Sequence, residues 1–207
     1  MSNIAFPTSL TPSSTTWSFV SNTRAYRSPL TNAVQTVARA GSLWRVTMQF
    51  NNLNDDDRAT LQAYLLSMDG QVNRMKLADH SYTRRGAGGG TPLVNGASQT
   101  GGTLIIDGAT ADVGDWLMRG DYFRVGNELK MLTADSSSDG SGDVTLNFKP
   151  NLRSSPANND PIYINTGTNL TTNVVYGVFL LASDPKWDNR PGIFSSFSLE
   201  AFEDVLA

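Results

Sequence analysis

Hydrophobic and polar residues alternate along several short stretches of this chain, a pattern typical of β-strands with one buried and one solvated face. The clearest stretch is 43–50, where Trp44, Val46, Met48 and Phe50 point to one side. The polar residues between them point to the other side. This stretch therefore predicts a strand of an antiparallel sheet that faces a core on one side and water on the other.

One segment has helical spacing instead. Asn54 is suited to cap a helix, and three aspartates at 55–57 would lie in the first turn, where the helix dipole favours negative charge. The predicted apolar face consists of Leu61, Tyr64, Leu65 and Met68. Gly70 is suited to end the helix in a left-handed conformation. We interpret the aspartates as the first helical turn and not as a metal site.

Further strand signals divide the chain into parts. The glycine-rich stretch 84–90 predicts a flexible joint, and short strand patterns between turns follow as far as residue 165. Gly126-Asn127 predicts a two-residue hairpin turn among them. Strand patterns at 71–79, 174–182 and 197–201 predict three further strands, each of which needs a neighbouring strand to pair with. We therefore predict a mostly β protein with one discontinuous domain, 1–84 plus 166–207, and a small β-barrel or sandwich domain inserted at 85–165.

Composition narrows the class of protein. Hydrophobic residues make up 39% and charged residues 17%, which favours a packed core over disorder. The net charge of −3 without a dense basic patch argues against sequence-specific nucleic-acid binding. Cysteine is absent, which excludes disulfides and thiolate chemistry. The start has no secretory pattern and no apolar run reaches membrane-spanning length, so we expect a soluble protein made in a cytoplasm, with no membrane partner.

Candidate chemistry is sparse. His80 is the one histidine, and its neighbours Asp79 and Ser81 are too close in sequence to converge on it as a catalytic triad. The stretch 135–143 partly matches a calcium loop, but Leu146 stands where a bidentate glutamate is needed. We interpret both as loop residues. We predict no catalytic residue, no metal site and no cofactor.

Four weaker motifs also favour ordinary structural explanations. The glycines at 86–90 lack the lysine of a phosphate-binding loop, and Arg119-Gly120-Asp121 is a short adhesion-like match beside a predicted strand. Asn169-Leu170-Thr171 matches a glycosylation acceptor that has no secretory context. The loop with Asp184, Trp187 and Asp188 could serve as a sugar platform or a carboxylate pair, but an anchored tryptophan beside solvated acids is the commoner arrangement.

The order of several short motifs resembles the distal tail proteins of long-tailed bacteriophages and related minor tail proteins. The motifs span most of 17–165 and are Ser28-Pro29-Leu30-Thr31, Gln35-Thr36, Arg39-Ala40-Gly41, Trp44-Arg45-Val46-Thr47, Arg58, Leu61, Leu65, Leu66-Ser67-Met68-Asp69-Gly70, Asn73, Asp79, Arg85-Gly86, Val94-Asn95-Gly96-Ala97-Ser98-Gln99-Thr100-Gly101, Trp116-Leu117, Gly120-Asp121-Tyr122-Phe123 and Leu146-Asn147-Phe148-Lys149-Pro150-Asn151-Leu152-Arg153.

This resemblance implies a β-sandwich "belt" domain with one helix, six copies of which form a ring at the distal end of the tail tube. The implied partners are further copies of the chain, the tail tube protein, the tail hub and other tail-tip proteins, and the tape measure protein, with DNA passing through the lumen. The implied location is the tail tip of a virion made in a bacterial cytoplasm. The implied role is structural, not enzymatic.

Two other functions are open at this point. A carbohydrate-binding module of a tail-tip protein would use the small β domain or the loop around Trp187. A glycan hydrolase would need a pair of carboxylates that sequence alone does not reveal. Oligomeric mass distinguishes the ring from a binding module, glycan titration tests the module, and unchanged polysaccharide substrates would exclude the hydrolase.

Overall fold

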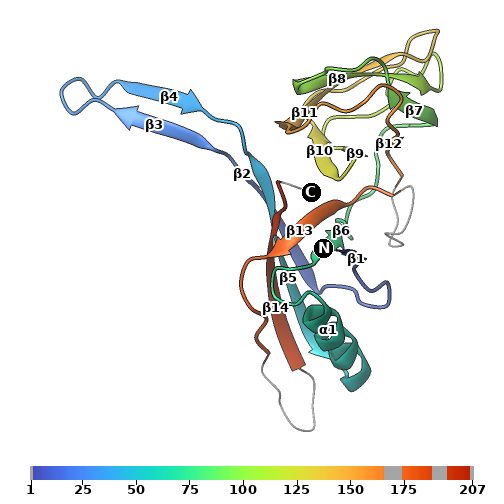
Figure 1. The fold of residues 1–207 in the computed structure, drawn as a ribbon. Coiled ribbons are helices and arrows are strands. Elements are labelled where there is room, and N and C mark those ends of the chain that lie inside the picture. The colour runs from blue at the N-terminus through green and yellow to red at the C-terminus, as the bar shows by residue number, and fades with distance from the viewer. Residues whose placement is uncertain (1, 166–173, 188–194, 206–207) are drawn as a thin grey trace.

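The computed structural model describes residues 2–165, 174–187 and 195–205. In this part of the chain the structure is built from β-strands and one helix (Figure 1). The prediction of a mostly β fold with one helix is confirmed.

The first sheet, which we call the belt sheet, takes strands from both ends of the chain. Its order is β1-β6-β13-β14-β5-β2. The bounds are β1 Asn3–Ala5, β2 Ser14–Val20, β5 Leu43–Leu53, β6 Arg74–Leu77, β13 Gly177–Leu181 and β14 Ser195–Glu203. The β1–β6 pair is parallel and the other pairs are antiparallel. The sheet therefore needs residues from before 84 and after 165 to be complete.

The second sheet takes all its strands from between residues 90 and 163, and we call 85–165 the insert. Its order is β12-β9-β10-β11-β8-β7. The bounds are β7 Gly90–Val94, β8 Gly101–Ala109, β9 Tyr122–Val125, β10 Glu128–Leu132, β11 Val144–Leu152 and β12 Ile162–Tyr163. A bridge between Leu93 and Pro161 brings the two edge strands together, so the sheet is nearly closed. The predicted two-residue turn at Gly126-Asn127 joins β9 to β10.

Strand β5 forms the centre of the belt. Trp44, Val46, Met48 and Phe50 are each at most 6% exposed, as their alternation predicts. β5 pairs with β14 on one side and with β2 on the other. The apolar face of β5 therefore supplies much of the belt core.

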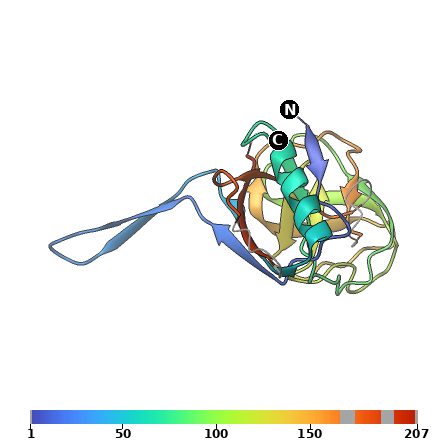
Figure 2. The same ribbon diagram turned by 90° about the horizontal axis from the view of Figure 1, so that it is seen from below.

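Helix α1, Asp55–Ser67, covers part of this core, with Leu61, Tyr64 and Leu65 buried (Figures 1 and 2). The Asn54 side chain accepts a hydrogen bond from the Asp57 backbone N–H at 2.8 Å, as predicted. The predicted end at Gly70 is wrong, because the helix stops at Ser67 with Met68 as its right-handed C-cap. Gly70 takes its positive φ of 64° in the turn that follows. Among the described residues, no helix is long and apolar enough to cross a membrane.

The predicted flexible joint is instead fixed in place. The buried carboxylate of Asp121 accepts hydrogen bonds from the backbone N–H groups of Arg85 and Gly86, both at 2.8 Å. A Cβ on Gly86 would lie 2.5 Å from the Leu117 Cα. The glycine therefore permits close packing of two backbone segments, which the sequence alone does not distinguish from flexibility.

We predict that Asn54→Ala lowers the free energy of unfolding by about 1 kcal/mol, because the Asp57 N–H loses its acceptor. Urea denaturation followed by circular dichroism measures this change. Asn54→Ser is the matched control, since serine also caps helices, and it should retain most of the stability. Equal stability of the alanine variant and the original chain would show that the cap contributes nothing.

Candidate assembly surface

A β-hairpin projects away from both sheets (Figures 1 and 2). Its strands are β3, Thr23–Arg27, and β4, Val34–Ala38, and they pair only with each other among the described strands. We call residues 21–41 the arm. The sequence patterns predict no strand within 21–41, so both strands of the arm are apparent only in the structure.

Local hydrogen bonds shape the two ends of the arm. At the tip, the Ser28 N–H donates to the Ala33 carbonyl at 2.9 Å, and Asn32 has a positive φ of 56°. At the root, the Asn22 side chain donates to the Ala40 carbonyl at 2.6 Å, and Gly41 has a φ of 99°. The arm is therefore an ordered continuation of β2 and β5, bent at its root.

The arm exposes apolar surface along its whole length. Every residue of β3 and β4 is exposed. Of the ten large hydrophobic side chains exposed among the described residues, six lie on the arm and its root. These six are Phe19, Val20, Tyr26, Leu30, Val34 and Val37. A two-stranded hairpin without a covering layer is only marginally stable in water, so this concentration of apolar side chains indicates a contact surface.

The arm is also basic. It carries Arg24, Arg27 and Arg39 and no acidic residue. None of these three arginines forms an ion pair with a described residue. The rest of the chain has 13 basic against 19 acidic side chains, a net charge of −6.

The pairing register distributes these side chains over both faces of the arm. Arg24 pairs with Val37 and Arg27 pairs with Val34, and paired residues of antiparallel strands share a face. Since neighbouring residues on a strand alternate, Arg24 and Arg27 lie on opposite faces. Each face therefore combines a free guanidinium with an exposed aliphatic side chain.

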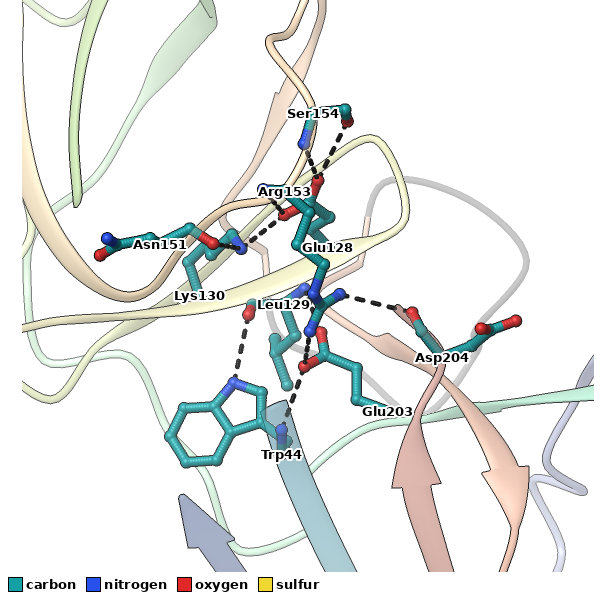
Figure 3. A network of polar contacts seen from close by, with 9 residues as sticks. All are labelled: Trp44, Glu128, Leu129, Lys130, Asn151, Arg153, Ser154, Glu203 and Asp204. Carbon is teal, nitrogen blue, oxygen red and sulfur yellow. Dashed lines mark hydrogen bonds and ion pairs between the residues drawn. The ribbon is translucent and has the colours of Figure 1, made fainter. Parts of the chain in front are cut away.

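A buried polar junction joins the insert to the belt (Figure 3). The Glu203 carboxylate on β14 accepts hydrogen bonds from the backbone N–H groups of Trp44 at 3.1 Å and Leu129 at 3.3 Å, and it forms an ion pair with Arg153. The Trp44 indole N–H donates to the Leu129 carbonyl at 3.1 Å. Leu129 and Tyr122 of the insert also belong to the belt core. The insert is thus fixed to the belt by polar contacts over a shared core.

A second ion pair lies beside this junction. The buried Lys130 ammonium is 2.6 Å from Glu128 and donates to the Asn151 carbonyl at 2.9 Å. Burial by itself would raise the pKa of the Glu128 carboxyl, but Lys130 and the backbone N–H groups of Arg153 and Ser154 outweigh it and hold the pKa below its ordinary 4.5. Burial also lowers the pKa of Lys130, and Glu128 only partly offsets this effect.

In the described part of the chain, His80 and the loop 135–143 make local structural contacts. His80 packs edge-on against Phe6 at 5.9 Å between ring centroids, and Asp79 accepts hydrogen bonds from Ser81 instead. The Asp139 carboxylate accepts hydrogen bonds from the backbone N–H groups of Ser141 and Asp143, at 2.8 and 2.9 Å, within its own loop. In the described ranges, no three histidine or acidic side chains are grouped so that they could hold a metal ion.

Two residues of the remaining motifs, Trp187 and Asp121, also lie in structural positions. Trp187 is half-buried against the belt core, which favours an anchoring tryptophan over a sugar platform. Asp121 of the adhesion-like tripeptide is fully buried. Asp188 and the motif Asn169-Leu170-Thr171 lie outside the described residues.

A cavity of about 360 Å³ opens between 84–93 and 161–165 in the insert.

No model of a protein family matches the sequence, and no curated protein is similar to it.

We predict that Glu203→Ala lowers the free energy of unfolding by about 3–5 kcal/mol, because Arg153 and two backbone N–H groups stay buried without their acceptor. Glu200→Ala on the same strand is the matched control. Its exposed ion pair with Arg45 is worth only about 0.2–1 kcal/mol. Urea denaturation of both variants compares the two sites, and equal losses would contradict the structural role of the junction.

The Glu128–Lys130 pair makes stability depend on acid pH. Because the pKa of Glu128 is lower in the folded than in the unfolded chain, its stabilising contribution is complete above the unfolded pKa and is lost as pH falls through the folded pKa. We expect the free energy of unfolding to decrease as the pH is lowered past about 5. Glu128→Gln should be less stable at neutral pH and show a shallower loss in acid. Glu200→Gln is the control, and identical slopes for Glu128→Gln and the original chain would refute this assignment.

Proposed function

We propose that this chain is a structural subunit of the distal end of a bacteriophage tail, where copies of it form a six-membered ring between the tail tube and the hub. The observation that carries the proposal is the projecting arm, whose exposed apolar and basic side chains require a partner outside the chain. In this role the protein acts through its surfaces and catalyses no reaction.

The exposure of the arm supports assembly on physical grounds. Leu30 at the tip is 94% exposed and Tyr26 is 53% exposed. A partner that covers such side chains would stabilise the contact by about 25 cal/mol for each Å² of apolar surface removed from water. A chain that orders a hairpin so far from its own core is best explained by a contact in which that hairpin is covered.

The arrangement of the two sheets supports the same role. The arm continues β2 and β5 of the belt sheet, and the insert is attached at Trp44 near the same end of β5. The Glu203 junction fixes the insert to the belt. A contact made by the arm would therefore also determine where the insert lies in an assembly. This arrangement suits a ring that connects one tail component to another.

We predict that the purified chain, at tens of micromolar and low salt, forms particles with six times the mass of one chain. Multi-angle light scattering measures the mass, and negative-stain imaging should show rings with a central opening. Closed rings with a copy number other than six would correct the proposed copy number and leave the rest of the proposal standing. A chain that stays monomeric under these conditions, also when tail tube and hub proteins are present, would refute the proposal.

A further inference from the structure

The arm is a second kind of surface, opposite in charge to the rest of the molecule. All 19 acidic residues lie between Asp55 and Asp204, whereas the only charged residues of the arm are its three arginines. Opposite charge on two separate surfaces of one chain favours contact between copies of that chain. The arm does not satisfy this attraction within its own chain, since its arginines form no ion pair with a described residue and it points away from both sheets (Figures 1 and 2).

We infer that the arm binds an acidic surface of a second copy of this chain, in a one-way contact in which each copy donates its arm to the next. The inference rests on the proposed ring and names the contact that builds it. The donor and acceptor surfaces differ, so the contact is head-to-tail and closes into a ring when the rotation between copies allows it.

Each part of the arm has a distinct task in this contact. Arg24 and Arg27 lie on opposite faces, so the acceptor receives the arm on both faces and not on a flat surface. Tyr26, Val34 and Val37 supply the apolar area that leaves water. The charges bring the copies together and select the partner, and the apolar side chains keep the contact closed.

Charge reversal on the arm tests the inference. The variant Arg24→Glu/Arg27→Glu/Arg39→Glu should weaken self-association at least tenfold, because like charges then face each other across the contact. The control Arg85→Glu/Arg119→Glu/Lys186→Glu changes the net charge equally at exposed positions outside the arm. Sedimentation velocity over a range of concentrations measures both. Thermal unfolding confirms that both variants fold. We expect this because the described arm residues contribute no buried side chain to either core and the three control positions are exposed.

Salt and hydrogen exchange give independent readouts. Raising the salt concentration from about 0.05 to 0.5 M should weaken association of the original chain, because it screens an attraction, and should strengthen that of the arm variant, because it screens a repulsion. Backbone amides of β3 and β4 should exchange slowly in the assembled state and fast in the monomer. Equal weakening by both triple variants, or amides that stay unprotected in the assembly, would overturn the arm contact.

Mixing tests the direction of the contact. An arm-deleted chain, with 23–38 replaced by an Asn-Gly turn, can accept an arm but cannot donate one. Added in small amounts to the intact chain, it should join the assemblies and convert rings into shorter open oligomers. An arm-deleted chain that never joins them would show that the contact is not one-way.

The outcomes separate this inference from the proposed ring. Closed rings that form from the triple arm variant would refute the arm contact and leave the ring proposal standing. Protected arms in small oligomers that never close would support the contact and count against the ring. A monomer with unprotected arms at every concentration, also when tail tube and hub proteins are present, would refute both.

Discussion

Burial of one face of β5 is the interaction on which the rest of the structure depends. Trp44, Val46, Met48 and Phe50 place four large side chains in the belt core, and β14 and β2 pair on either side of them. Burying a side chain of this size stabilises by about 1.5–3 kcal/mol. The helix, the insert and the arm are all positioned relative to this strand.

The two ends of β5 have different surroundings. Beyond its C-terminal end, Asn54 begins α1, which covers the core. At its N-terminal end, Trp44 is held by the Leu129 carbonyl of the insert and packs edge-on against Phe19 at 5.9 Å between ring centroids. Beyond Phe19 and Trp44 the hairpin continues without a covering layer. The arm thus begins where the core ends, and for this reason its apolar side chains are exposed.

The polar junction explains how the insert is held against the belt. Glu203 and Arg153 are fifty positions apart in the chain, and their ion pair is almost fully buried. Ion pairs of this kind add little net stability compared with apolar packing, but breaking one leaves an unpaired buried charge. They therefore penalise every orientation of the insert in which the two partners separate. A ring built from such subunits would carry the insert in a fixed place.

The sequence by itself determined the elements whose evidence is local. The alternation around Met48 identifies β5, the Asn54 cap identifies the start of α1, and Gly126-Asn127 identifies a hairpin turn, because each depends on the period or chemistry of neighbouring residues. Only the tertiary structure decided that Gly86 packs closely against a backbone, that Glu203 meets Arg153, and that the arm is uncovered. These features depend on residues far apart in the chain. Valines among polar residues occur in covered and in exposed strands alike, so the exposed surface of the arm could not be recognised before its surroundings were known.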